Sequence, residues 1–404
     1  MEQDELRGKI LPHLLGSCAV CRERHGEVIR LRDEIGHWNE EVGVLEGPEA
    51  LLLWERLAGC TQDERLRLAE EQEEFHTWGL CHHLISKSRQ AILDSPEQAA
   101  DFAGLAVLLS THLSEAYDRS WIFDLRARAM AHLGNARRVL GEMRSAEDAF
   151  GKAQRCLAKS SSGNDSVRAE LLGLLASLRR DQRRFDDALL LLDEALPIRR
   201  AANDARGGGA TLLIKAQILA EVGDARGAIE LLEQGVTEIN AAEDPHLFAY
   251  IRNSTLLCLI QEARFAEAEQ LVVEVRTLLA AVGKPLDSVR LFWTEGLLAL
   301  ARGELGPAEA AFREVRQEFL DRGMGYDAAL VSLDLAELYA RENLHDELKR
   351  LASELMPIFA SRDVHREALV ALFFFQKACE DQQMTVTLVR EIAAHLRRER
   401  ISPA

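Results

Sequence analysis

Apolar and small side chains return at a fixed interval in the middle of the chain. Alanines mark the register at Ala146, Ala188, Ala228, Ala268 and Ala308, with steps of 42, 40, 40 and 40 residues. A larger apolar side chain follows each alanine four positions later, and a small or apolar residue follows seven positions later. Residues at i, i+4 and i+7 share one face of an α-helix. The pattern predicts one helix per repeat that packs closely against a neighbour.

A second helix is expected in each repeat, because another small or compact residue precedes each alanine by twelve positions. These residues are Gly134, Ala176, Ala216, Leu256 and Gly296. Polar or glycine-bearing segments separate the repeats, at residues 159–167, 203–210, 240–246, 282–288 and 322–327. We interpret Gly207 to Gly209 as part of one of these turns. Stacked helix pairs would then bury a continuous core.

At this register the residues resemble the tetratricopeptide repeat (TPR). The matching residues are Leu133, Gly134, Ala146, Phe150 and Ala153 in one unit and Gly296, Ala308 and Phe312 in another. The chain departs from the family at its usual first-helix tyrosine, which is Arg137 in one unit and Leu219 in another. The TPR has a basic length of about 34 residues, so a 40-residue spacing implies longer helices. The resemblance covers about residues 120 to 395.

The resemblance implies an all-α fold, a right-handed α-α superhelix of five or six long TPR-like units. We expect three regions: residues 1–60 as an irregular helical N-terminal region, 61–119 as degenerate helix pairs, and 120–404 as a TPR-like solenoid closed by a C-terminal capping helix. Thr61 followed by Glu64 has the spacing of a capping box, and Ser95 before Pro96 predicts another helix start. We place a helix break near Gly79.

The net charge of the chain limits the kinds of partner that we expect it to bind. Its 49 Lys and Arg stand against 66 Asp and Glu, a formal net charge of −17. An acidic surface repels phosphate and anionic lipid, so direct nucleic-acid or membrane binding is disfavoured. Residues 1–100 hold 11 basic and 20 acidic residues, a net of −9, so this end could alternatively meet a basic partner. With no apolar run of spanning length and seven scattered cysteines, we expect a cytoplasmic, reduced protein of bacterial type.

One constellation has the spacing of metal ligands: His13, Cys18, Cys21 and His25. On a helix the last three leave from one face, and His13 could complete a tetrahedral zinc site. The segment resembles the zinc-binding helical domain of bacterial anti-sigma factors, which implies a structural zinc. Here four residues separate His13 from Cys18, where that family has three. The alternative is a pair of ordinary helical cysteines with surface histidines.

A second cluster comprises His76, Cys81, His82 and His83. Adjacent helical residues point about 100° apart, so packing or a solvated face is the better interpretation. The sequence has no glycine-rich phosphate loop, nucleophile elbow or helix-borne zinc-protease motif. We therefore expect a protein that is not an enzyme.

The concave side of the solenoid is the predicted binding surface, with no cofactor other than the possible zinc. Several of its residues are basic or carry amides, which favours an acidic peptide or helix; solvation alone is the alternative. The predicted partner-binding residues are Arg128, His132, Asn135, Arg138, Lys215, Gln217, Tyr250, Asn253, Arg290, Trp293, Asp334 and Glu337.

The sequence thus indicates a non-catalytic interaction scaffold or regulatory subunit that binds a protein or peptide. Two alternatives stay open. In one, an anti-sigma-like regulator sequesters a transcription factor through its N-terminal region. In the other, the chain inhibits or adapts a neighbouring protease or another effector enzyme. The oligomeric state cannot be inferred from the pattern.

Overall fold

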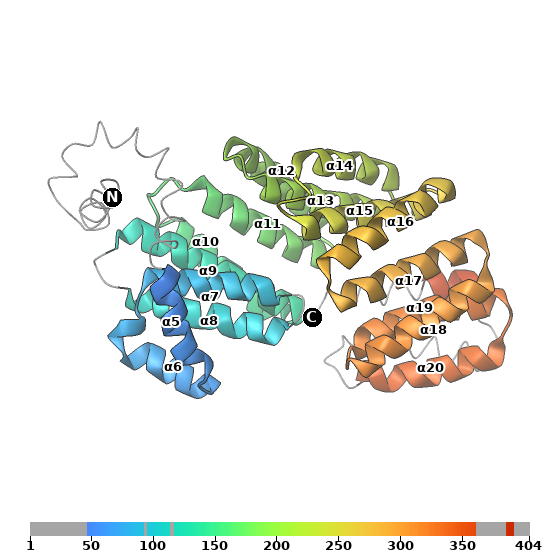
Figure 1. The fold of residues 1–404 in the computed structure, drawn as a ribbon, viewed down its shortest axis with the longest axis horizontal. Coiled ribbons are helices and arrows are strands. Elements are labelled where there is room, and N and C mark those ends of the chain that lie inside the picture. Colours follow the sequence, from blue (N-terminus) through green and yellow to red (C-terminus); the bar gives the residue numbers. More distant parts are fainter. Residues whose placement is uncertain (1–46, 93–94, 114–116, 361–384, 392–404) are drawn as a thin grey trace. The chain divides into compact units, whose positions relative to one another are not determined.

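Helices make up the secondary structure of the described part of the chain. The computed structural model describes residues 47–92, 95–113, 117–360 and 385–391, and no strand occurs among them. The first elements are α5 (Gly47–Ala58), α6 (Gln62–Glu71), η1 (Glu73–Phe75), α7 (Trp78–Ala91) and α8 (Pro96–His112). Six helix pairs follow within the described residues (Figure 1): α9 (Arg119–Val139) with α10 (Met143–Leu157), α11 (Asp165–Asp181) with α12 (Phe185–Ala201), α13 (Ala205–Val222) with α14 (Ala225–Glu238), α15 (Pro245–Gln261) with α16 (Phe265–Val282), α17 (Pro285–Arg302) with α18 (Leu305–Asp321), and α19 (Gly325–Arg341) with α20 (His345–Ala360). The odd-numbered helices from α9 are called first helices below, and their partners second helices.

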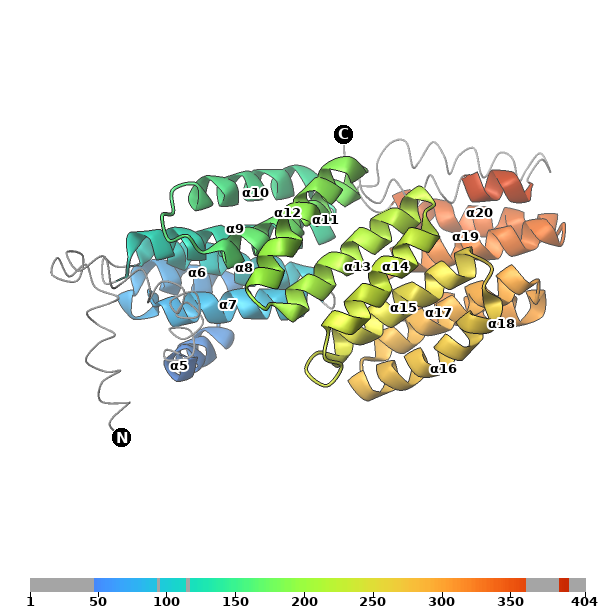
Figure 2. The ribbon, with the colours of Figure 1, turned by 90° about the horizontal axis from the view of Figure 1, so that it is seen from above.

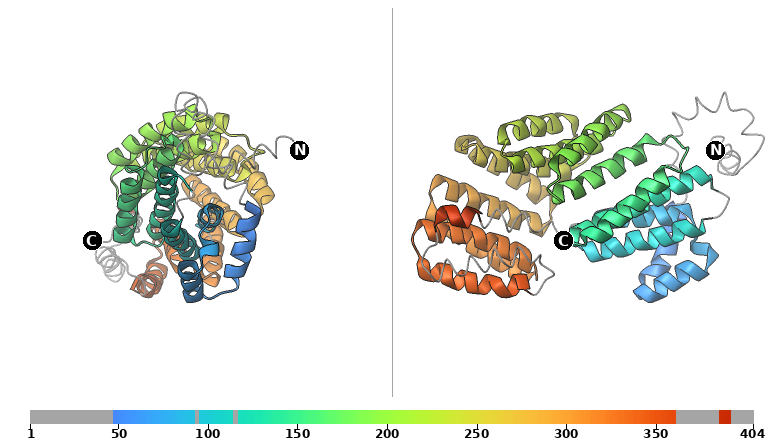
Figure 3. Two further views of the ribbon diagram at one scale, coloured as in Figure 1. Left: turned by 90° about the vertical axis from the view of Figure 1, so that its left-hand side faces the viewer. Right: turned by 180° about the vertical axis from the view of Figure 1, so that it is seen from behind.

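The described residues divide into two compact units. Unit 1 lies within Met1–Arg179 and Leu190–Ile198, and unit 2 lies within Arg180–Leu189 and Arg199–Ala404. In unit 1, α7 packs against α8, α8 against α9 and α9 against α10 (Figure 3). In unit 2 every helix from α13 to α20 packs against the next, and α13, α15, α17 and α19 also contact one another in turn (Figure 2). This nearest-neighbour packing is the arrangement that a stacked repeat requires.

The predicted core register is confirmed. All five register alanines are 0% exposed. Their glycine partners make room for aromatic rings: a Cβ at Gly134 would lie 3.0 Å from Cδ2 of Phe150, and one at Gly296 would lie 2.7 Å from Cε1 of Phe312. The other three repeats carry the pairs Ala176 and Leu192, Ala216 and Leu232, and Leu256 and Val272 at these positions. Across the repeats, the smaller the residue on the first helix, the larger its partner on the second helix.

The repeat extends to the backbone of the turns. One residue with φ between 55° and 95° lies between the first and second helix of each pair: Gly141, Arg183, Gly223, Ala263, Gly303 and Asn343. At Ala263 the N–H bonds to the carbonyl of Ile260, and the next N–H, of Arg264, bonds to that of Leu259. Such bonds satisfy the last carbonyls of the first helix. The turns therefore follow the same steps of 42 and then 40 residues as the register alanines, even where the residue is not glycine.

The interpretation of Gly207 to Gly209 as a turn is wrong. All three are buried in the start of α13, and the Asp204 side chain accepts a hydrogen bond from the N–H of Gly207. A Cβ at Gly209 would lie 2.2 Å from Cδ1 of Ile239, and one at Gly208 would lie 2.9 Å from Oε2 of Glu238. The glycines serve close helix approach, which outweighs their low helix propensity.

Most of the other local signals are confirmed. Thr61 and Glu64 form the complete capping box of α6, and Pro96 begins α8. The predicted break lies slightly earlier than Gly79, because α7 already begins at Trp78. Of the predicted C-terminal cap, residues 386–391 are helical, and Val389 is buried in the core of the last pair. The expected region boundaries at 60 and 119 stay predictions.

Candidate interaction surface on the first helices

Most of the predicted partner-binding residues share one face of the first helices. Counted from the buried small residue of each first helix, they stand at positions −6, −3, −2 and +1, which lie within about 100° of one another. We call this side the first-helix face. It comprises Arg128, His132 and Asn135 in unit 1, and Gln217, Tyr250, Asn253, Arg290, Trp293, Asp334 and Glu337 in unit 2. Arg138 borders it at position +4.

Lys215 lies elsewhere. It is two residues from Gln217, so the two side chains leave α13 about 200° apart. The equivalent residue of α17 is Glu295, which pairs with Arg276 of the second helix α16. By this register Lys215 faces the second helices.

In unit 1 the half-buried carboxylate of Glu170 pairs with two of the predicted residues. Arg128 Nε donates to Glu170 Oε2 at 2.7 Å, and His132 Nε2 lies 2.9 Å from Oε1. Burial raises the pKa of Glu170, but Arg128 and His132 outweigh burial, so the pKa lies well below its ordinary value. Arg138 Nε donates to Asn135 Oδ1 at 3.1 Å. The bonds to Glu170 join α9 to α11, whereas the bond between Arg138 and Asn135 lies within α9.

Two further titratable groups lie near this cluster. His82 is largely buried on α7, where burial and the charge of Arg128 lower its pKa to about 4. Asp124 of α9 is 1% exposed, and burial raises its pKa. Its Oδ2 accepts a hydrogen bond from Ser162 at 2.5 Å, while Oδ1 has no partner among the described residues.

In unit 2 the same kind of bond joins successive first helices. Arg180 donates to Gln217 Oε1 and to Glu221 Oε1, each at 2.6 Å. Trp293 Nε1 donates to Asp334 Oδ2 at 2.8 Å. These side chains are therefore engaged within the fold.

Glu337 is also engaged, by one arginine of its own helix and one from the C-terminal segment. It accepts from Arg341 Nη2 at 2.5 Å and from Arg390 Nη2 at 2.6 Å. Burial raises the pKa of Glu337, but the hydrogen bonds from these two guanidinium groups lower it by more, so the pKa lies below its ordinary value.

Asp287 is the centre of the contacts between α15 and α17. It is 4% exposed, accepts from Tyr250 OH at 3.1 Å and lies 3.2 Å from His246 Nε2. Burial and the charge of Asp287 raise the pKa of Tyr250 to about 12. Tyr250 therefore stays a neutral hydrogen-bond donor.

Two groups beside this cluster are poorly satisfied within the described residues. Arg290 Nη1 lies 3.5 Å from Tyr250 OH and 3.9 Å from Asp287 Oδ1, both at the long limit of such contacts. Asn253 Oδ1 is buried and has no hydrogen-bond partner among the described residues. A buried acceptor without a partner costs about 1 to 3 kcal/mol.

Sequence reasoning missed the partners of the predicted residues. Glu170, Glu221 and Asp287 were not singled out, although each pairs with a side chain 37 to 42 residues earlier. The available signal was an acidic residue one repeat after a donor.

Comparisons with known proteins bear on the fold. No protein-family model matches the chain, and no curated protein matches it. A crystal structure of a Rap protein complexed with competence and sporulation factor matches with a TM-score of 0.59 at 10% identity, over 78% of this chain and 88% of that chain. Aspartyl phosphate phosphatase F from Bacillus subtilis matches with a TM-score of 0.54 at 11% identity, over 88% and 95%. A tetratricopeptide repeat protein from Parabacteroides merdae is also similar, with a TM-score of 0.43 at 14% identity, over 74% and 98%.

The chain has an all-α, TPR-like repeat fold. The predicted fold class is thereby confirmed. At such low identity the likeness concerns the fold alone.

Metal chemistry in this TPR-like chain was predicted only for its first residues. His13, Cys18, Cys21 and His25 lie outside the described residues, so the zinc site stays a prediction. In the described part, no group of three or more His, Cys, Asp or Glu is placed to hold a metal ion. In the second cluster, Cys81 is fully buried, and His76 stacks on His112 with ring centres 4.7 Å apart.

Over the described residues, no helix is both long and apolar enough to cross a bilayer.

Proposed function

We propose that this TPR-like protein is a non-catalytic interaction protein that binds an extended acidic peptide or protein segment on the first-helix face of unit 2. The observation that carries the proposal is the pair of poorly satisfied groups on adjacent first helices, Asn253 on α15 and Arg290 on α17. Most other polar groups of this face are engaged by neighbouring repeats.

The chemistry of the two groups suits a peptide. A guanidinium with only long contacts can form a bidentate pair with a carboxylate, which is the strongest geometry for such recognition. A primary amide supplies both a donor and an acceptor, as a peptide backbone requires. Rotation of the Asn253 amide exchanges its oxygen and nitrogen, which would bring the buried oxygen to the position of the nitrogen.

Tyr250 and Trp293 flank these groups with half-buried rings. Aromatic side chains beside a charged anchor are common energetic centres of interfaces. Asp334 and Glu337 of this face, and Asp287 beside it, already accept hydrogen bonds within the fold. What remains is the Arg290 guanidinium and the Asn253 amide, which are suited to binding.

The structural neighbours are consistent with this role. One was solved as a Rap protein complexed with competence and sporulation factor. The fold that the two chains share therefore accommodates a bound factor in that protein.

Selection from a displayed library of random peptides tests the proposal. We expect the full chain to enrich peptides with Asp or Glu, and the double substitution Asn253→Ala, Arg290→Ala to lose that enrichment. Arg276→Ala is the matched control, because it removes a guanidinium from the second helix α16 and breaks only an exposed pair with Glu295. Enrichment that survives the double substitution would place binding elsewhere.

A second role rests on the ligand-like spacing of His13, Cys18, Cys21 and His25. In that proposal the N-terminal region holds zinc and captures a transcription factor, while the repeats support that region or sense a peptide or a second protein. We expect one zinc per chain by metal analysis and its loss in Cys18→Ser, Cys21→Ser. Affinity capture from the native host with the full chain and with residues 1–60 deleted separates this role from the first. A partner captured by both forms binds the repeats.

A further inference from the structure

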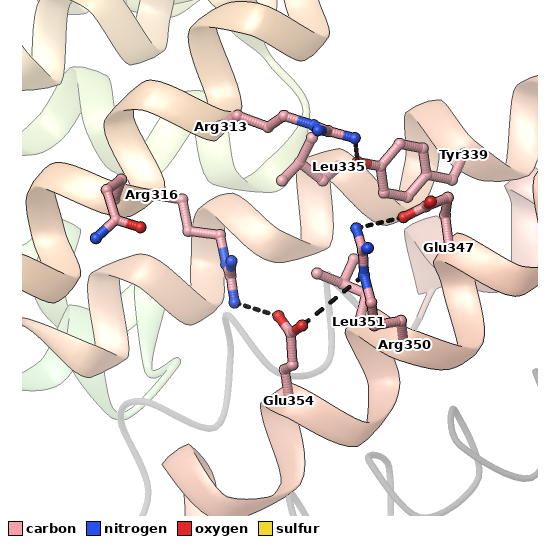
Figure 4. A pocket seen from close by; sticks show the side chains of 9 residues that line it. Arg313, Arg316, Leu335, Tyr339, Glu347, Arg350, Leu351 and Glu354 are labelled. Atoms are coloured by element: carbon pink, nitrogen blue, oxygen red, sulfur yellow. Dashed lines mark hydrogen bonds and ion pairs between the residues drawn. The ribbon is translucent and has the colours of Figure 1, made fainter.

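A polar cavity of about 230 Å³ lies between α18, α19 and α20, in unit 2. Figure 4 shows charged side chains from α18 and α20 converging on it, with Tyr339 and Leu335 contributed by α19. On α19, Leu335 directly follows Asp334, whose side chain bonds to Trp293 of α17, and Tyr339 lies about one turn beyond Leu335. Adjacent helical residues point about 100° apart, so this cavity is a different surface from the first-helix face.

Guanidinium groups outnumber carboxylates around the cavity. Its lining includes Arg313, Arg316 and Arg350 against Glu347 and Glu354. The lining therefore has a surplus of one positive charge in a chain whose formal net charge is −17.

One carboxylate is shared between two of these arginines. Glu354 Oε2 accepts from Arg316 Nη2 at 2.6 Å, while its Oε1 lies 3.9 Å from Arg350 Nε. Arg350 also pairs with Glu347 at 2.5 Å. Arg316 is fixed independently, since its Nε donates to the buried Ser332 hydroxyl at 2.8 Å. Glu354 thus occupies the position where an external anion would meet both guanidinium groups.

The third arginine, Arg313, lies on α18, three residues before Arg316. Arg313 Nη2 donates to Tyr339 OH at 3.1 Å and lies 2.7 Å from Glu309, which is not part of the lining. Arg313 and Arg350 are 55% and 61% exposed, so a ligand can reach both side chains.

We propose that this cavity is a binding site for a small oxyanion, either a phosphate group or the carboxylates of a small dicarboxylate. Planar guanidinium groups match the geometry of both anions. The cavity of about 230 Å³ has room for a small anion with part of its hydration. Leu335 and Leu351 supply an apolar floor.

Isothermal titration of the full chain with inorganic phosphate and, separately, with succinate tests this site. We expect saturable binding of one of them, weakened at least tenfold by Arg313→Ala together with Arg350→Ala. Glu354→Gln should instead tighten binding severalfold, because it removes a negative charge and releases two guanidinium groups. A purely structural ion-pair network has no reason to respond in that direction. Phosphate binding alone identifies a phosphorylated ligand, and succinate binding identifies a dicarboxylate.

Arg322→Ala is the matched control. This arginine directly follows α18, pairs with Glu318 of that helix, and lies outside the cavity lining. Thermal unfolding of every variant confirms that it is folded, and Arg313→Lys with Arg350→Lys keeps the charge if the alanine variants unfold. Absence of saturable binding by both anions overturns the proposal. So does binding that is equal in the wild type and the folded cavity variants.

Discussion

At the scale of single residues, the two helices of a repeat have core side chains of complementary size. Gly296 leaves room for Phe312, and a Cβ there would meet Cε1 of the ring at 2.7 Å. The ring is fully buried, so it has little freedom to move. Repeats with alanine or leucine at the first position carry leucine or valine at the second.

Gly296→Ala should therefore destabilise the fold by about 1 to 3 kcal/mol, as overpacking does, less the roughly 1 kcal/mol that alanine contributes to a helix. In a Phe312→Leu background the same substitution should be neutral or stabilising. Urea unfolding of the four combinations gives the coupling energy. Additive effects of the two substitutions would show that residues 296 and 312 are not energetically coupled.

His82 makes the stability of unit 1 depend on pH. Burial and Arg128, together with Arg89 and His83, lower its folded pKa to about 4, while Glu170 opposes the shift; an unfolded histidine titrates near 6.5. The folded chain therefore binds the proton less tightly than the unfolded chain. The contribution is present above about pH 6.5 and is lost as the pH falls towards 4.

At pH 5 the free energy of unfolding should be lower by up to about 2 kcal/mol than at neutral pH, since each unit of pKa shift corresponds to 1.36 kcal/mol. His82→Gln should remove this part of the pH dependence. Urea unfolding at pH 7.5 and pH 5 measures it in both proteins. Equal losses in the wild type and in His82→Gln would assign the acid sensitivity to other groups.

At the scale of the helix pair, the turn between the two helices contains a residue with a left-handed backbone conformation, even where that residue is not glycine. Ala263 adopts φ 55° where its equivalents Gly223 and Gly303 adopt φ 95° and 80°. A left-handed conformation costs a residue with a Cβ about 1 to 2 kcal/mol. No heavy atom other than the immediate neighbours would lie within 4 Å of a Cβ at Gly303, so the backbone conformation is the main factor.

Ala263→Gly should stabilise the protein by about 0.5 kcal/mol, since the relief of strain exceeds the extra entropy of the unfolded chain. Gly303→Ala is the reverse substitution at an equivalent turn and should destabilise by a similar or larger amount. Thermal unfolding measures both shifts. Destabilisation by Ala263→Gly would show that its turn is not strained.

Much of the helix-pair architecture could be predicted because its signal is local and repeated. The spacing of Ala146 to Ala308 identified the buried face, and Phe150 and Phe312 marked the residues packed on it. Gly207 to Gly209 misled, since glycine in a sequence signals a turn as readily as a close helix contact. Only the position of Ile239 in three dimensions separates the two.

The candidate surface could be predicted less well. Tyr250, Asn253, Arg290 and Trp293 were identified from their place in the repeat. Their engagement was not, because the partner of a side chain such as Tyr250 lies on the next first helix, 37 residues away at Asp287. Lys215 was misplaced by one position, which on a helix turns a side chain through about 100°.

At the scale of the whole molecule, an acidic TPR-like chain presents its polar groups in pairs between repeats. In unit 2, Arg290 and Asn253 depart from that pattern, and the proposed function rests on them. If the described repeats recognise an acidic segment, its affinity must depend on the charge at residue 290. Screening by salt should also weaken it.

The most direct test is a charge exchange between the protein and its peptide. A peptide selected by the full chain is titrated against the wild type and Arg290→Glu, with its Asp or Glu either kept or replaced by Arg. We expect Arg290→Glu to weaken the acidic peptide at least tenfold and the Arg-bearing peptide to recover most of that affinity on the variant. If Arg290→Glu binds the acidic peptide as the wild type does, or if no exchanged peptide recovers affinity, Arg290 does not receive the ligand and the first-helix face of unit 2 is not the binding site.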